Sequence, residues 1–138
     1  MSTDPKITVS DRAGRRCASS GARWEPIMGY SRAVRSGNTV AVTGTVGVNA
    51  DGTYPSSVGE QTRRSLVIIR AALEALGARL EHVIRTRMYL TGAEHWEQVA
   101  RAHGEVFAAV RPAATAVIVA GLLDPAWLVE IEAEATLP

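Results

Sequence analysis

The chain has 138 residues, enough for one domain with a single core of helices packed on a sheet. Hydrophobic residues make up 46% and charged residues 21%, and the net charge of +1 argues against nucleic acid or an anionic membrane as a partner. The N-terminus lacks the apolar core of a signal peptide, and no apolar run is long enough to span a membrane, so we expect a cytoplasmic protein.

Residues that mark metal and cofactor sites are sparse. A single cysteine, Cys17, excludes an intrachain disulfide, and nothing near it in sequence forms a nucleophile pair with it. The three histidines are scattered, and the glycines form neither a dinucleotide-binding nor a Walker pattern. The sequence therefore predicts no metal and no cofactor.

The N-terminal part of the chain predicts three strands behind a loose segment. We expect residues 1–13 to form a flexible arm and residues 14–138 to form a single domain. Residues 24–26 are expected to be an irregular link. Turn residues at 36–38 favour a hairpin between the second and third strands. The three expected strands are 15–19, 30–35 and 39–45.

A first helix is predicted after a polar loop. Ser57 and Glu60 have the Ser-x-x-Glu spacing of a capping box, in which the two side chains satisfy free amides of the first turn. Gly77 is a suitable residue just beyond the helix end. The helix should bury a stripe at three- and four-residue spacing, made of Thr62, Leu66, Ile69, Leu73 and Leu76.

A strand and a second helix follow. Alternation over 82–90 should place Ile84, Met88 and Leu90 on one face, and Arg85, Arg87 and Tyr89 on the other. A second capping box is predicted at 91–94, and Pro112 should end the helix behind it. The expected apolar stripe is Trp96, Val99, His103, Val106 or Phe107, and Val110, which makes His103 a core residue.

The C-terminal part predicts two buried strands, 113–120 and 128–135, joined by a turn at Gly121 and Asp124-Pro125. Glu130 and Glu132 stand two residues apart on the second strand, so their carboxylates share one face. Two carboxylates on an otherwise apolar strand are costly unless a cation or water meets them. This face is therefore the expected place of function.

The predicted order is β-β-β-α-β-α-β-β, an α+β fold with a mixed sheet of five to six strands and two helices on one face. The uncovered face would carry Arg85 and Arg87 opposite Glu130 and Glu132. Because these charges are complementary, we expect burial against other copies of the chain in a homo-oligomer.

Three segments together resemble the Rid/YjgF family, whose active members deaminate imines and enamines. They are GYSRAVRSGNTVAVTGTVGV, IRTRMYLT, and a closing Pro-Ala-x-Thr strand followed by VEIEAEA. The resemblance extends from about Trp24 to Thr136. It implies a chorismate-mutase-like fold and a homotrimer with ligand clefts between subunits.

The resemblance also implies site residues. Tyr30 matches the pocket tyrosine of the family, and Thr43 and Gly44 match a Ser/Thr-Gly pair that faces the ligand. Glu130 matches the carboxylate that positions the water.

Two positions depart from the family pattern. Ala114 stands where the family has the arginine that grips a substrate carboxylate, and Ala116 replaces a cysteine of many active members. Arginine provides a bidentate donor fork that alanine lacks, so hydrolysis of simple 2-imino acids is doubtful.

Several hypotheses follow from these residues. The first is a deaminase-like hydrolase with an altered substrate and water positioned by Glu130. The alternative is a non-catalytic trimer that binds a small metabolite in the same cleft. A protein that acts on nucleic acid is the weakest of the three hypotheses. Arg87 (or Arg85) either replaces the missing anchor or only pairs with Glu130 and Glu132. Trp24 and Trp127 either line a cleft or cover a subunit interface.

Overall fold

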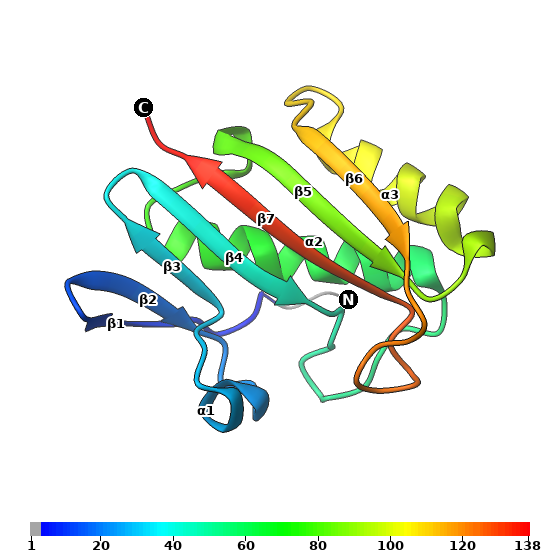
Figure 1. Ribbon diagram of the computed structural model, residues 1–138, viewed down its shortest axis with the longest axis horizontal. Coiled ribbons are helices and arrows are strands. Elements are labelled where there is room, and N and C mark those ends of the chain that lie inside the picture. The colour runs from blue at the N-terminus through cyan, green and yellow to red at the C-terminus, as the bar shows by residue number, and fades with distance from the viewer. Residues whose placement is uncertain (1–3) are drawn as a thin grey trace.

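The computed structural model describes residues 4–138 and shows one twisted sheet with two long helices packed on one face (Figure 1). The sheet has seven strands in the order β1-β2-β3-β4-β7-β5-β6. Its strands are β1 (Thr8–Arg12), β2 (Arg15–Ser19), β3 (Ala33–Ser36), β4 (Thr39–Thr45), β5 (Val83–Leu90), β6 (Ala113–Ile118) and β7 (Val129–Thr136). The helices are α1 (Trp24–Met28), α2 (Val58–Ala75) and α3 (Trp96–Phe107), with single 3-10 turns at Leu80–His82 and Ala93–His95.

The predicted α+β class, with a mixed sheet and two main helices on one face, is confirmed. Neighbouring strands are antiparallel except β5 and β6, which are parallel. The sheet has more strands than expected because a hairpin extends it at the N-terminal edge. Within the described residues, no helix is both long and apolar enough to cross a bilayer.

Residues 8–12, expected to belong to a flexible arm, instead form strand β1. They pair with β2 from Thr8 opposite Ser19 to Arg12 opposite Arg15. The turn uses Ala13 and Gly14, both at positive φ (51° and 75°). Alanine rarely adopts that conformation, and Ala-Gly is not one of the Asn-Gly or Asp-Gly pairs that usually indicate a hairpin turn. The sequence therefore does not predict this hairpin. Residues 1–3 of the expected arm lie outside the described residues.

Residues 24–26, expected to be an irregular link, instead begin the short helix α1. Pro26 is tolerated because it lies in the first turn, where a backbone N–H has no helical acceptor. Gly29 ends the helix at φ 74° and donates its N–H to the Glu25 carbonyl. As a result β3 starts at Ala33 rather than at residue 30, and Tyr30 leaves the sheet.

Helix α2 is confirmed almost to the residue. The Ser57 hydroxyl accepts from the Glu60 N–H, and Gly77 follows the end of the helix at φ 84°. The Glu60 carboxylate contacts Arg63 at 2.6 Å instead of completing the box. All five residues of the expected stripe are buried.

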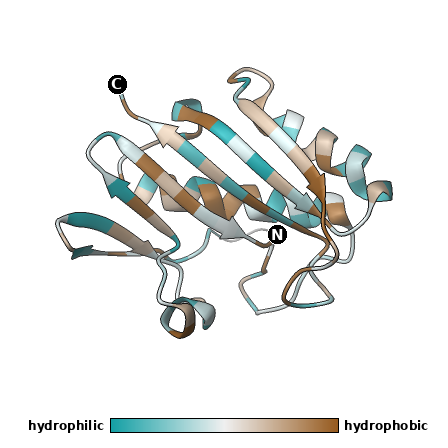
Figure 2. Ribbon diagram, in the orientation of Figure 1, coloured by the Kyte–Doolittle hydropathy of each residue, from teal (hydrophilic) through white to brown (hydrophobic). Residues whose placement is uncertain are grey.

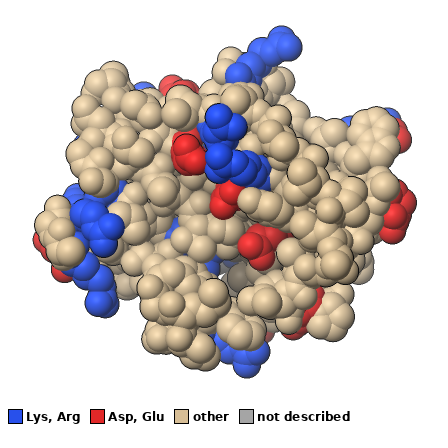
Figure 3. Space-filling view, viewed as in Figure 1, with Lys and Arg blue, Asp and Glu red and all other residues tan. Residues whose placement is uncertain are grey.

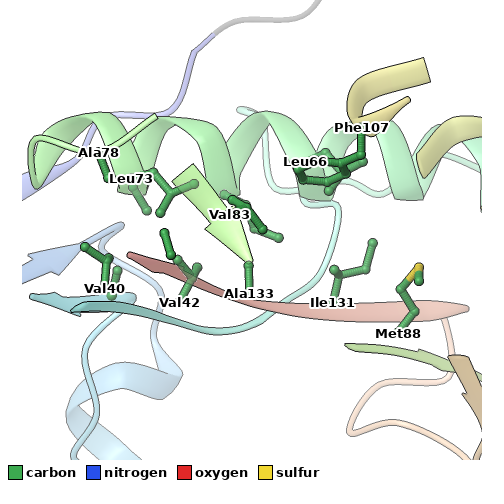
Figure 4. Packing of buried hydrophobic residues seen from close by; sticks show 14 of the residues in the cluster. Val40, Val42, Leu66, Leu73, Ala78, Val83, Met88, Phe107, Ile131 and Ala133 are labelled. Atoms are coloured by element: carbon green, nitrogen blue, oxygen red, sulfur yellow. The ribbon is translucent and has the colours of Figure 1, made fainter. Parts of the chain in front are cut away.

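The core lies between α2 and the central strands (Figure 4). Val40 and Val42 of β4 and Ile131 of β7 point toward Leu66 and Leu73 of the helix. These side chains are at most 3% exposed, so truncating one of the leucines to alanine should cost about 2–5 kcal/mol. Hydrophilic and hydrophobic residues alternate along β7, which buries one face of that strand (Figure 2).

Two expected features of the next segment are wrong. Ile84 is 53% exposed and Val83 is buried instead, because the pairing register shifts between Val83 and Arg85. The capping box at 91–94 does not form: a 3-10 turn without a side-chain cap precedes α3. Trp96 consequently stays 63% exposed rather than joining the buried stripe.

His103 is half-buried and does not lie fully in the core, where it was expected. Its Nε2 is 2.9 Å from the Thr86 hydroxyl, its ring packs on Phe107, and burial lowers its pKa.

Strand β6 is not buried in the single chain, contrary to expectation. All six of its residues are exposed, because it is an edge strand paired only with β5. An uncovered apolar edge is a surface that association with other copies would bury.

Candidate active-site cleft

The described residues form a cleft of about 880 Å³, and Glu130 is among the residues that line it. It is bounded by α1, by the end of β4 with the loop that follows, and by the loop before β7. The space-filling view shows this face hollowed near its centre, with acidic and basic side chains beside the hollow (Figure 3). The four cleft residues predicted from the resemblance all line it: Tyr30, Thr43, Gly44 and Glu130.

Glu130 presents a largely desolvated carboxylate to the cleft. Burial raises its pKa, and the nearby Glu132 charge raises it further, while Arg32 acts in the opposite direction. Within residues 4–138 the carboxylate makes no hydrogen bond or ion pair, although its residue lines the cleft. A carboxylate with a raised pKa and no fixed partner is suited to take up and release a proton.

Gly44 allows this carboxylate to lie against the backbone of β4. A Cβ at position 44 would collide with Glu130 Oε2. The β4–β7 pairing also shifts register between Val42 and Thr45, which interrupts the ladder at this point. The glycine is therefore required by close approach and not by a special φ angle.

Arg32 is a buried cation that sequence reasoning missed. It is 6% exposed and lines the cleft. Its Nη1 donates to the Gly44 carbonyl (2.8 Å) and to the Thr45 hydroxyl (3.1 Å), and its Nη2 donates to the Tyr30 hydroxyl (3.2 Å). The guanidinium thereby links Tyr30 to the end of β4 near Glu130.

The segment that carries Arg32 contains no sequence signal for burial. An arginine next to alanine and valine at the start of a strand is usually a solvent-facing residue. Arg32 points inward because of helix α1, which the sequence analysis did not predict.

Glu25 is the carboxylate beside the Arg32 guanidinium. Its Oε2 is 4.0 Å from Arg32 Nε, and the carboxylate accepts from the Ser19 and Ser20 hydroxyls at 2.7 and 2.8 Å. Burial opposes its ionisation, but these hydrogen bonds together with Arg32 hold its pKa below the usual value. Glu25 is thus a structural counter-ion that ties α1 to β3.

Tyr30 and Thr43 are oriented by the same network. Because the Tyr30 hydroxyl accepts from Arg32, its own hydrogen can be donated into the cleft. The Thr43 hydroxyl donates to the Ser31 carbonyl at 2.6 Å, so toward a ligand it acts as an acceptor.

Arg87, Ala114 and Ala116 do not line the cleft of their own chain. Arg87 contacts Glu134 at 3.0 Å and Glu132 at 3.4 Å, and the Tyr89 hydroxyl donates to Glu132 at 2.7 Å. The expected pairing of arginine with glutamate therefore forms, but it engages Glu134 where Glu130 was expected. Ala114 and Ala116 lie on β6, two strands beyond β7, or about 10 Å across the sheet.

Trp24 and Trp127 both line the cleft of the single chain. Trp127 lies between Trp24 and Tyr54, with ring centroids 6.3 and 6.1 Å away and both contacts edge-to-face. Its Nε1 is buried and has no hydrogen-bond partner among residues 4–138.

Comparison with known proteins identifies the family of the chain. A family model described as Endoribonuclease L-PSP, the model of the Rid/YjgF family, matches residues 20–137. The chain belongs to the Rid/YjgF family. Glu130, Tyr30 and the Thr43-Gly44 pair can therefore be compared with the corresponding positions of Rid proteins.

Three relatives illustrate the range of the family. An uncharacterised protein of Streptomyces coelicolor is 38% identical, over 92% of this chain and 95% of that one. The crystal structure of Rv2704 from Mycobacterium tuberculosis, a member of the YjgF/YER057c/UK114 family, is 41% identical with a TM-score of 0.83, over 89% of this chain and 99% of that one. A 2-iminobutanoate/2-iminopropanoate deaminase of Dermatophagoides farinae is 29% identical, over 78% of this chain and 85% of that one.

Proposed function

We propose that this Rid-family chain is a small-molecule hydrolase that adds water to the C=N bond of an imine or of an enamine in its imine form. The observation that carries the proposal is Glu130: a partly buried carboxylate at the cleft, with a raised pKa and no ion pair within the described residues. Such a group can act as a general base at a pH closer to neutrality than an ordinary glutamate.

The reaction balances with one water and no other co-reactant. Glu130 accepts a proton from the water as its oxygen bonds to the imine carbon. That proton passes to the nitrogen and gives a carbinolamine. Glu130 then moves the proton of the carbinolamine hydroxyl to the nitrogen, the C–N bond breaks, and ammonia leaves as the carbonyl forms. Tyr30, whose hydroxyl accepts from Arg32, is placed to donate to the substrate.

Arg32 acts as a positioning residue in this scheme. It binds the Tyr30 hydroxyl and the Gly44 carbonyl, and its charge lowers the pKa of Glu130 against the effect of burial. It thus holds the donor in place and keeps part of the base ionised.

Because alanine occupies position 114, the substrate of this chain should differ from small 2-imino acids. Without the arginine fork, a substrate carboxylate loses a charge-assisted anchor that contributes about 1.5–3 kcal/mol. The net charge of +1 likewise gives no electrostatic basis for RNA as the substrate.

Assembly into a homotrimer is part of the proposal. Strand β6 exposes all of its residues, and a neighbouring copy could bring Ala114 and Ala116 to the cleft rim. Sedimentation equilibrium should give three times the mass of the chain. A monomer would remove the neighbouring copy from the scheme.

The function is tested by ammonia release from imines that an amino-acid oxidase generates in situ from amino acids with side chains larger than that of alanine, since Ala114 disfavours the smallest 2-imino acids. Wild type should accelerate release, Glu130→Gln should lose about a hundredfold or more, and Glu132→Gln should retain activity because Glu132 is engaged by Arg87 and Tyr89. Equal rates for wild type and Glu130→Gln would overturn the role of Glu130.

The second candidate is a trimer that binds a metabolite without turnover, and the alanines at 114 and 116 favour it. Ala114→Arg distinguishes the two. If wild type is inactive and Ala114→Arg is active, the residues that activate water are intact. Silence of both proteins, with ligand retained unchanged, would favour the binding protein.

A further inference from the structure

The wall of the cleft opposite its polar end is built from aromatic rings. The chain has only three Trp, three Tyr and one Phe, yet Trp24, Tyr30, Tyr54 and Trp127 all line this one cleft. Three of these rings come from separate segments: α1, the loop before α2 and the loop before β7. These segments lie along the lower edge of the molecule in Figure 1.

The fold alone gives little reason for this concentration. The main core between α2 and the sheet is made of aliphatic side chains and Phe107, without Trp or Tyr. The aromatic rings instead pack edge-to-face with one another at the cleft, and Trp127 buries an indole N–H that finds no acceptor within residues 4–138. A buried donor without an acceptor is costly, so packing of the fold gives no evident reason for a tryptophan at this position.

Two large apolar side chains at the cleft are also exposed. Met28 and Leu123 both line it while remaining 63% and 66% exposed. Exposed apolar side chains beside a ring-lined hollow indicate a surface that a ligand covers.

The size of the cleft points in the same direction. A volume of about 880 Å³ lies in the range of sites for drug-sized ligands, which bury most of their surface. A compound as small as 2-iminopropanoate would leave most of this volume to water. A flat substituent that reaches the rings would fill it.

Resting on the proposed function, we infer that the substrate is an imine with an aromatic or similarly flat apolar substituent. The reacting C=N group lies at Glu130 and Tyr30, and the substituent packs against Trp24, Tyr54 and Trp127. Selectivity therefore comes from the ring-binding end of the cleft, which compensates for the anchor missing at Ala114.

The test compares two imines that differ only in the side chain: those generated by amino-acid oxidase from phenylalanine and from alanine. Both carry the same carboxylate, so the ratio of their kcat/KM values reports the side chain alone. We expect wild type to prefer the phenyl compound about tenfold to a hundredfold. Tyr54→Leu should reduce that ratio by about tenfold, and Trp96→Leu, which changes an exposed ring on α3, should leave it unchanged.

Calorimetric titration with phenylpyruvate and pyruvate, the two products, separates the failure of this inference from that of the proposed function. Turnover of both imines at equal kcat/KM would overturn the inference and leave the hydrolase intact. No turnover, with phenylpyruvate bound at least tenfold tighter in a Tyr54-dependent way, would overturn the hydrolase and uphold only the part of the inference that places a flat apolar substituent against the rings. No turnover and no preference in binding would overturn both.

Discussion

Strand β7 places three glutamates on one face at alternate positions, and their surroundings give them different properties. Glu132 and Glu134 lie on the open part of the sheet, where they share Arg87 and where Tyr89 donates to Glu132. Glu130, two residues before Glu132, is desolvated at the cleft and has no such partner in the described part of the chain. Identical side chains on one strand face thus divide into an ion-pair cluster and a candidate catalytic base.

The two arginines nearest to these groups differ in the same way. Arg87 is partly exposed and its charge is shared by two carboxylates. Arg32 is almost wholly buried, and its donors are used by the Gly44 carbonyl, Thr45 and Tyr30. Exposed ion pairs contribute little to stability, whereas removing one member of a buried network leaves polar groups unsatisfied. The comparison can be tested one residue at a time.

The largest effect on stability should come from Arg32→Met. The substitution leaves the Gly44 carbonyl, the Thr45 hydroxyl and the Glu25 carboxylate without their cation, so the free energy of unfolding should fall by about 3 kcal/mol. Urea denaturation measures it. A loss below about 1 kcal/mol would mean that the network does not stabilise the fold.

Gly44→Ala should have the next largest effect, on turnover. The new Cβ occupies the place of Glu130 Oε2, so the carboxylate must move, and a displacement of this kind should lower kcat by about tenfold or more. Gly104→Ala is the matched control, because its Cβ meets nothing within 4 Å and alanine is the better helix former. Equal kcat in Gly44→Ala and Gly104→Ala would show that the approach of Glu130 to β4 is unimportant.

Glu130→Gln should change the pH dependence of stability. Because burial raises the pKa of Glu130 in the folded state, its protonated form is stabilising below the unfolded pKa, and that contribution is lost as pH rises through the folded pKa. Glutamine does not titrate, so the gain in Tm of Glu130→Gln over wild type should be larger at about pH 8 than at about pH 4. A gain that is independent of pH would contradict a desolvated carboxylate.

The smallest effect is expected for Arg87→Met. Although Glu134 and Glu132 raise the pKa of Arg87, the side chain is exposed and its pairs are screened, so Tm should change far less than in Arg32→Met. Thermal unfolding of both variants in the same buffer measures the difference. A comparable loss would mean that association with other copies buries the ion-pair cluster.

The local pattern of the sequence determined the main elements. The Ser57 cap, the five-residue stripe and Gly77 define α2, and alternation defines β7 with Glu130 and Glu132 on its polar face. The resemblance carried by GYSRAVRSGNTVAVTGTVGV and VEIEAEA indicated Tyr30, Thr43, Gly44 and Glu130, which the fold brings to one cleft. These features were predictable because periodicity, caps and short motifs depend on neighbouring residues alone.

Only the tertiary structure decided which polar residue meets which. Arg32 is buried because α1 turns the chain inward at Gly29. Glu130 is left without an ion pair because Arg87 lies opposite Glu132. The rings of Trp24, Tyr54 and Trp127 come together from three distant segments. The Ala13-Gly14 hairpin and the bulge before Arg85 depend on strand pairing that no local pattern shows. Burial and charge environment are properties of contacts between segments, and these contacts distinguish the candidate base from two glutamates of the same strand.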